Sequence, residues 1–178
     1  MRSFNTILVR LLLLLLAAHV ILGGFTLLKL TNLHWEGLSY VLLGGCLLHA
    51  VLGICLTIEP LRQCLRTGKW YFRQNASFWI IRLSGLAILL LLSFHLTAFT
   101  VVVNGMLFLR EFHWLRLLSQ LLFVSAIFIH LVYAAKPLAL KTGVWDFRES
   151  ASRYVLIYTI FALFSIFALI SYFCFWNF

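Results

Sequence analysis

Five long apolar stretches, separated by short polar connections, restrict the fold of this sequence more than any other feature. A helix needs about 20 consecutive apolar residues to cross a bilayer, and each stretch is about that long or longer. Backbone groups in lipid must be satisfied internally, which favours helices, and the stretches lack the strict alternation of barrel strands. The sequence therefore predicts an all-α integral membrane bundle of five transmembrane helices, at approximately Ile7–Leu30, Leu38–Ile58, Phe78–Leu107, Leu115–Ala135 and Tyr154–Phe175.

The composition excludes a water-soluble enzyme. Of the 178 residues, 63% are hydrophobic and 11% are charged, whereas a soluble domain has about 45–50% apolar and about 25% charged residues. The spans occupy most of the chain, so we expect residues 1–178 to form a single transmembrane domain. A water-exposed active site for a polar substrate must then come from a partner chain. We predict a multi-pass protein of the inner or plasma membrane.

The beginning of the first span resembles a signal peptide, because Arg2 and Arg10 precede the leucine run Leu11–Leu16. A signal core is about 7–15 residues long. Here the apolar run continues past His19 to Leu30, which is longer than such a core. We therefore expect a retained membrane helix.

Basic residues are distributed unevenly between the two sides of the predicted bundle. Loops rich in Lys and Arg stay in the cytoplasm, and eleven of the fourteen basic residues fall on the side of the N-terminus. The three on the other side are Lys29, Arg110 and Arg116. This predicts a cytoplasmic N-terminus and an outside C-terminus. The net charge of +9 then reflects topology, anionic lipid head groups and a docking surface for a cytoplasmic partner, so it requires no nucleic acid.

Four histidines lie inside the predicted spans, one in each of the first four helices: His19, His49, His95 and His130. An ionisable group within the bilayer is costly and indicates a functional site by default. The simpler alternative for any single one is a histidine that hydrogen-bonds between two helices. Four of them in four consecutive helices favour a shared function.

The depth of each histidine follows from the helical rise of about 1.5 Å per residue. Measured from the predicted cytoplasmic edge, His95 lies at about 27 Å, His19 at about 20 Å, His49 at about 15 Å and His130 at about 9 Å. These depths sort the side chains into an outer pair, His19 with His95, and an inner pair, His49 with His130. Each pair comes from two helices that run in the same direction.

Two stacked histidine pairs in a helix bundle are suited to two bis-histidine haems, since each iron takes one axial nitrogen from each side. Zinc prefers three or four ligands around one point, which separated pairs do not provide. The four cysteines form no C-x-x-C-H motif, so covalent c-type attachment is excluded. We therefore predict two non-covalent haem b groups.

At this point the sequence resembles the membrane cytochrome b subunit of succinate dehydrogenases and fumarate reductases, of the five-helix, two-haem, single-chain type. The second-helix segment Leu48-His49-Ala50-Val51-x-Gly53 and the combination of His130 with Gly143-x-Trp145 are similar to the corresponding segments of that family. The most specific match is to the pattern Phe-Trp-x-x-Arg-x-Ser/Thr-Gly followed by a helical run to a haem histidine, found here as Phe78-Trp79-Ile80-Ile81-Arg82-Leu83-Ser84-Gly85 and His95.

The resemblance implies a function. Members ligate one haem from helices one and three and the other from helices two and four, which agrees with the pairing by depth. A flavoprotein and an iron–sulfur subunit dock on the cytoplasmic side and interconvert succinate and fumarate. The cytochrome subunit carries electrons between them and a membrane quinone, often menaquinone. The dicarboxylate chemistry then occurs on the partner chains.

Further site residues are expected on the same basis. Haem propionates need cations or hydrogen-bond donors near the membrane edge, although Arg and Lys can also extend to lipid phosphates. A quinone site needs a titratable group, for which Glu36 with the adjacent His34 is the candidate; the acid that some members carry two residues before the fourth-helix histidine is here Phe128. The propionate candidates are Asn5, Thr6, Trp79, Arg82, Ser84 and Lys141 at the inner haem, and Arg110 and Arg116 at the outer haem.

Two alternatives remain open. One is the cytochrome b anchor of another quinone-linked enzyme, of the hydrogenase or formate dehydrogenase type. Those anchors usually dock their partner outside, whereas the basic inner loops here favour an inner partner. The other is a haem-free transporter or assembly protein with histidines in a polar pathway.

Overall fold

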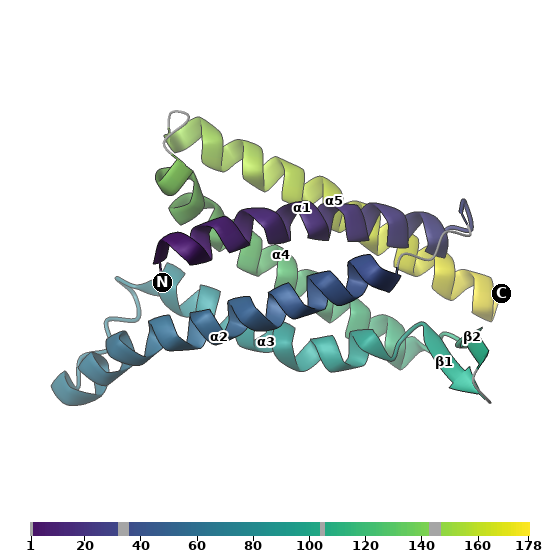
Figure 1. The fold of residues 1–178 in the computed structure, drawn as a ribbon, viewed down its shortest axis with the longest axis horizontal. Coiled ribbons are helices and arrows are strands. Elements are labelled where there is room, and N and C mark those ends of the chain that lie inside the picture. Colours follow the sequence, from purple (N-terminus) through teal and green to yellow (C-terminus); the bar gives the residue numbers. More distant parts are fainter. Residues whose placement is uncertain (1, 32–35, 104–105, 143–146) are drawn as a thin grey trace.

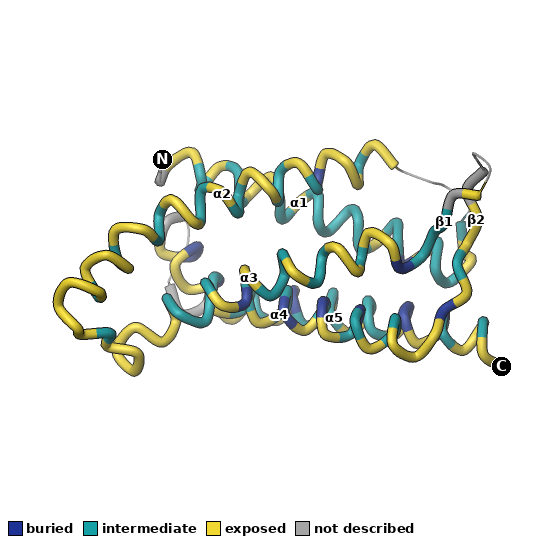
Figure 2. Tube along the Cα trace, turned by 90° about the horizontal axis from the view of Figure 1, so that it is seen from below, coloured by how far each residue is buried: buried dark blue, intermediate teal, exposed yellow. Residues whose placement is uncertain are grey.

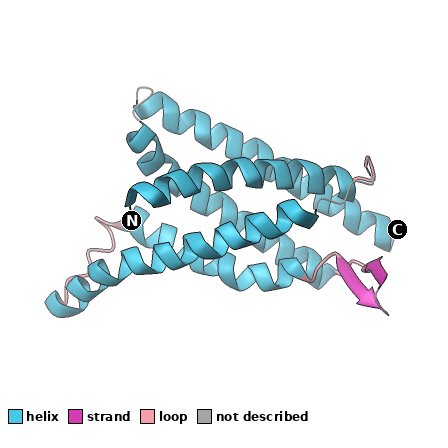
Figure 3. Cartoon of the chain, in the orientation of Figure 1, coloured by secondary structure: helices cyan, strands magenta, loops and turns pink. Residues whose placement is uncertain are grey.

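The computed structural model describes residues 2–31, 36–103, 106–142 and 147–178. Within these residues the chain forms five α-helices and one two-stranded hairpin (Figures 1 and 3). All five helices are long and apolar enough to cross a membrane, as the sequence predicts. In chain order the elements are α1 Arg2–Leu27, α2 Glu36–Thr67, α3 Ala76–Leu96, β1 Thr100–Val103, β2 Met106–Leu109, α4 Trp114–Thr142 and α5 Phe147–Asn177.

The helices form two layers that lie against each other. One layer holds α1 and α2, and the other holds α3, α4 and α5 (Figure 2). The closest backbone packing is between α3 and α4 and between α4 and α5, while α1 packs on α2 and α5. The backbones of α2 and α3 approach each other at few points. The two termini lie at opposite ends of the bundle (Figure 1).

Small residues permit the close helix contacts of α1. A side chain on Gly45 of α2 would meet Leu12 of α1, since a Cβ there would lie 2.7 Å from Cδ2 of that leucine. Gly24 of α1 likewise leaves room for the ring of Phe164 on α5. Such small residues at helix crossings are typical of membrane bundles, where association depends on close packing.

Every helix exposes large apolar side chains on the surface of the bundle. Large side chains such as Leu14, Leu90 and Leu163 are each more than half exposed. Soluble proteins rarely expose apolar patches of this extent. Hydroxyl groups inside the helices are satisfied by the carbonyl one turn back, as in Thr57 to Gly53 at 2.6 Å and Ser165 to Phe161 at 2.8 Å. Both features fit a surrounding of lipid chains rather than water.

The predicted third span is wrong at its end. A helix from Phe78 to Leu107 was expected, but α3 ends at Leu96 and the chain continues as an antiparallel hairpin in which Thr100 pairs with Leu109 and Val103 with Met106. The reason is the β-branched run of threonine and three valines, which is favoured in strands and unfavourable in helices. Apolar length alone cannot distinguish the two forms.

The helices also extend beyond several predicted ends. α2 passes Pro60 and ends at Thr67 rather than at Ile58, and α4 passes Pro137 and ends at Thr142 rather than at Ala135. α5 begins at Phe147 rather than at Tyr154. The predicted boundaries followed the change from apolar to polar residues. That change marks where lipid contact would stop, whereas a helix can continue into water with its backbone bonds intact.

Candidate functional site

The four span histidines meet across the two layers as two pairs. The ring of His19 on α1 lies 6.0 Å from that of His95 on α3, centroid to centroid. The ring of His49 on α2 lies 6.3 Å from that of His130 on α4. The structure thus brings together the same two pairs that the depth estimate predicts. Within the described residues no group of three or more His, Cys, Asp or Glu side chains gathers around one point.

Each of these four rings has an oxygen atom beside Nδ1. Where that oxygen can only accept, as with Oδ1 of Asn5, Oε1 of Gln120 and the carbonyl of Ile81, the hydrogen bond keeps the proton on Nδ1 and leaves Nε2 available as a metal ligand. The partner oxygens are Oγ of Ser39 for His19 at 3.4 Å, Oδ1 of Asn5 for His49 at 3.0 Å, Oε1 of Gln120 for His95 at 2.7 Å, and Oγ of Ser84 with the carbonyl of Ile81 for His130, both at 3.1 Å.

The segment from Arg82 to Gly85 of α3 contributes to the environment of the His130 ring. Ser84 donates its proton to the carbonyl of Ile80 at 2.6 Å, so its oxygen can accept from His130. The carbonyl of Ile81 can only accept, which requires the proton on Nδ1 of His130. Gly85 leaves room for the ring, since a Cβ there would lie 3.4 Å from Cε1 of His130.

Two buried donors in the first two turns of α3 have no hydrogen-bond partner among the described residues. They are Nε1 of Trp79 and Nε of Arg82. The Arg82 side chain points toward α2, where its Nη1 would be 3.4 Å from a Cβ on Gly53, one turn after His49. Buried donors normally find an acceptor, because leaving one unpaired costs about 1–3 kcal/mol. A carboxylate such as a haem propionate would supply that acceptor, so the residues present fit the group.

Two of the residues expected at an inner propionate contact a histidine. Asn5 and Ser84 were assigned to the inner propionates, and the structure places their oxygens beside Nδ1 of His49 and His130. Thr6 lies half-buried in the first turn of α1, next to Asn5. For Lys141 the structure describes the backbone of α4 but not the side chain.

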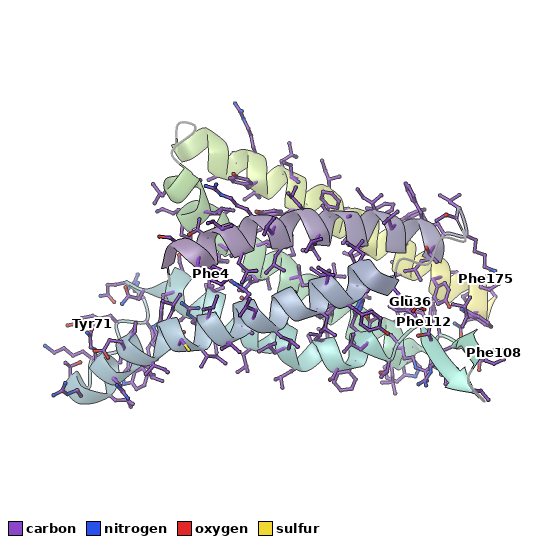
Figure 4. The ribbon with its side chains drawn as sticks, in the orientation of Figure 1. Phe4, Glu36, Tyr71, Phe108, Phe112 and Phe175 are labelled. Atoms are coloured by element: carbon purple, nitrogen blue, oxygen red, sulfur yellow. The ribbon has the colours of Figure 1, made fainter. Side chains whose placement is uncertain are left out.

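At the opposite end of the bundle, the structure shows other contacts for two of the remaining candidates. Arg116 donates to the backbone carbonyl of Glu111, and the backbone N–H of Arg110 donates to Phe99 at 2.8 Å. Glu36 is exposed at the start of α2, at the end of the bundle where Phe112 also lies (Figure 4). His34 lies outside the described residues.

Sequence reasoning missed Gln120 and Ser39 as partners of the outer pair. A glutamine inside an apolar span was the available signal for Gln120, since a buried amide requires a partner.

Comparisons with known proteins do not identify a relative of this chain. No family model, no curated protein and no solved structure matches this chain.

Proposed function

We propose that this chain is the dihaem cytochrome b membrane anchor of a succinate:quinone oxidoreductase. In this proposal the chain lies in the inner or plasma membrane with its N-terminus on the cytoplasmic side, and a flavoprotein and an iron–sulfur subunit dock on that side. Two haem b groups would supply one-electron transfer between the iron–sulfur subunit and menaquinone or another quinone. The chain is then part of an enzyme without carrying the dicarboxylate chemistry.

The spacing of the two histidine pairs is the observation that carries the proposal. An imidazole nitrogen binds a transition metal at about 2 Å, so two nitrogens on opposite sides of one metal lie about 4 Å apart and their ring centroids about 6 Å apart. The observed centroid separations are 6.0 Å for the outer pair and 6.3 Å for the inner pair. If the histidines only packed against each other, there would be no reason for both pairs to have this ring separation.

The chain's own residues would hold the two groups in place. His19 and His95 would be the axial ligands of the outer haem, and His49 and His130 those of the inner haem. The oxygens beside each Nδ1 keep the rings oriented, with the hydroxyl of Ser84 an example. The unpaired donors of Trp79 and Arg82 are suited to the inner propionates.

The absorption spectrum of the purified chain tests the proposal. A dithionite-reduced minus oxidised difference spectrum should show b-type haem bands, and a pyridine haemochrome assay should give two haems per chain. The same preparation from cell membranes should contain a flavoprotein and an iron–sulfur subunit, identified by mass. Absence of haem would favour the haem-free transporter, and a hydrogenase or formate dehydrogenase subunit would favour the other anchor type.

Gly85→Leu is expected to remove the inner haem and leave the outer one. A Cβ at this position would already be in van der Waals contact with the His130 ring, 3.4 Å from Cε1 and 3.6 Å from Nδ1, so the further carbons of leucine would displace the ring. The measurement is haem content per chain. Gly44→Leu is the matched control, since Gly44 is exposed and a Cβ there meets nothing within 4 Å. Equal haem content in both variants would contradict the expectation.

A further inference from the structure

Gln120 on α4 is the side chain from which a further inference starts, because it is polar and only 1% exposed. An amide in an apolar interior costs free energy unless its oxygen and nitrogen are hydrogen-bonded. Both are. Oε1 lies 2.7 Å from Nδ1 of His95, and Nε2 donates to Oγ of Ser119 at 3.1 Å.

The hydrogen-bond network fixes which way the amide points. Ser119 donates its own proton to the carbonyl of Arg116 at 2.8 Å, so its oxygen is free to accept from Nε2 of Gln120. The amide oxygen therefore faces His95, and since that oxygen can only accept, the proton of the imidazole is on Nδ1. The lone pair of His95 is then on Nε2.

The contact between Gln120 and His95 is the shortest that any of the four rings makes at Nδ1. The other distances are 3.0 Å from Asn5, 3.1 Å from Ser84 and 3.4 Å from Ser39. The His95 ring also stacks on Phe123, with centroids 4.8 Å apart and planes inclined by 28°. Its orientation is thus held from two sides by α4.

We propose that Gln120 is a positioning residue that lowers the reduction potential of the outer haem through His95. This inference rests on the function proposed above. A hydrogen bond from Nδ1–H to a strong acceptor raises the basicity of an imidazole ligand. A more basic axial ligand stabilises the more positively charged ferric iron, and second-shell hydrogen bonding is one of the ways in which a protein adjusts a haem potential. Without that acceptor the ferrous state would be more stable relative to the ferric state, and the reduction potential would be higher.

Redox titration of the wild-type chain and of Gln120→Met tests the inference. Methionine has nearly the same length and shape but offers only a weak acceptor. The midpoint potential of the outer haem should rise, by up to about tenfold in its reduction equilibrium or about 59 mV for a one-electron couple. The inner haem should keep its potential. The outer haem is recognised as the one that a His130→Ala chain retains.

Two further variants separate this role from simple helix packing. Gln120→Glu keeps an oxygen at the same reach, so the outer potential should stay at or below that of the wild type. Ser125→Ala is the matched control on α4, because the exposed hydroxyl of Ser125 donates to the carbonyl of Leu121 at 2.7 Å and the outer potential should not move. If Gln120→Met and Gln120→Glu shift the outer potential in the same direction, or if both lose that haem, the residue only supports the fold.

The titration also distinguishes this inference from the proposed function. A wild-type chain without haem would overturn both the proposed function and the role of Gln120. A wild-type chain with two haems, and unchanged potentials in Gln120→Met, would overturn the role of Gln120 and leave the dihaem assignment in place.

Discussion

Replacing His130 with alanine is expected to halve the haem content of the purified chain, leaving only the outer haem. His130 and His49 face each other at 6.3 Å, and the inner haem would lose one of its two axial nitrogens. With one imidazole left, the residues that would hold the inner haem would lose half of their iron ligation, so we expect that haem not to be retained. The outer pair shares no residue with the inner pair, so His19 and His95 remain at 6.0 Å. Pyridine haemochrome content per chain measures the result.

His113→Ala is the control for this experiment. The His113 side chain is 58% exposed and lies 3.9 Å from a carboxylate oxygen of Glu111, on the chain segment before α4. Both haems should therefore remain in that variant. A folded His130→Ala chain that retains two haems, or that retains none, would contradict the assignment of His130 to the inner pair alone.

The membrane spans and the relative depths of the histidines could be predicted from the sequence because both depend only on position along the chain. Apolar length predicts the spans, and a fixed rise per residue converts sequence position into depth. The depths therefore predict that His19 pairs with His95 and His49 with His130. The ring separations in the structure agree with that matching.

The partners of the histidines could not be predicted in the same way. Which side chains face each other depends on the rotation of each helix about its axis. In a soluble bundle the apolar stripe shows that rotation, but here every helix face is apolar, and α1 and α5 expose leucines such as Leu14 and Leu163. Depth alone therefore left Asn5 among the propionate candidates, whereas the structure places it 3.0 Å from His49.

The hairpin after α3 illustrates a second limit. Its signal was present in the sequence, since Asn104-Gly105, which lies outside the described residues, follows three valines, and Asn-Gly is the pair favoured in two-residue hairpin loops. The apolar length of the segment from Phe78 to Leu107 concealed it. The β-branched run therefore favours a strand after α3, where hydrophobicity predicted a longer helix.

The second large effect expected is a difference between two double variants. His49→Ala combined with His130→Ala removes both ligands of one haem, so the chain should lose no more haem than either single variant. His95→Ala combined with His130→Ala removes one ligand from each pair, so the chain should contain no haem. Residues that act as a unit show such non-additive losses, while residues in separate units add.

The two double variants test the ligation more strictly than a single substitution does. Each of them contains two histidine-to-alanine changes within the same bundle. A general loss of packing would therefore reduce haem content in both to a similar extent. The proposed ligation instead requires one haem per chain in the within-pair variant and none in the cross-pair variant, with the helical circular dichroism of both unchanged. The complementary combination of His19→Ala with His95→Ala should retain the inner haem. If a cross-pair variant kept a haem that a within-pair variant lost, the pairs seen at 6.0 and 6.3 Å would not be the ligand sets.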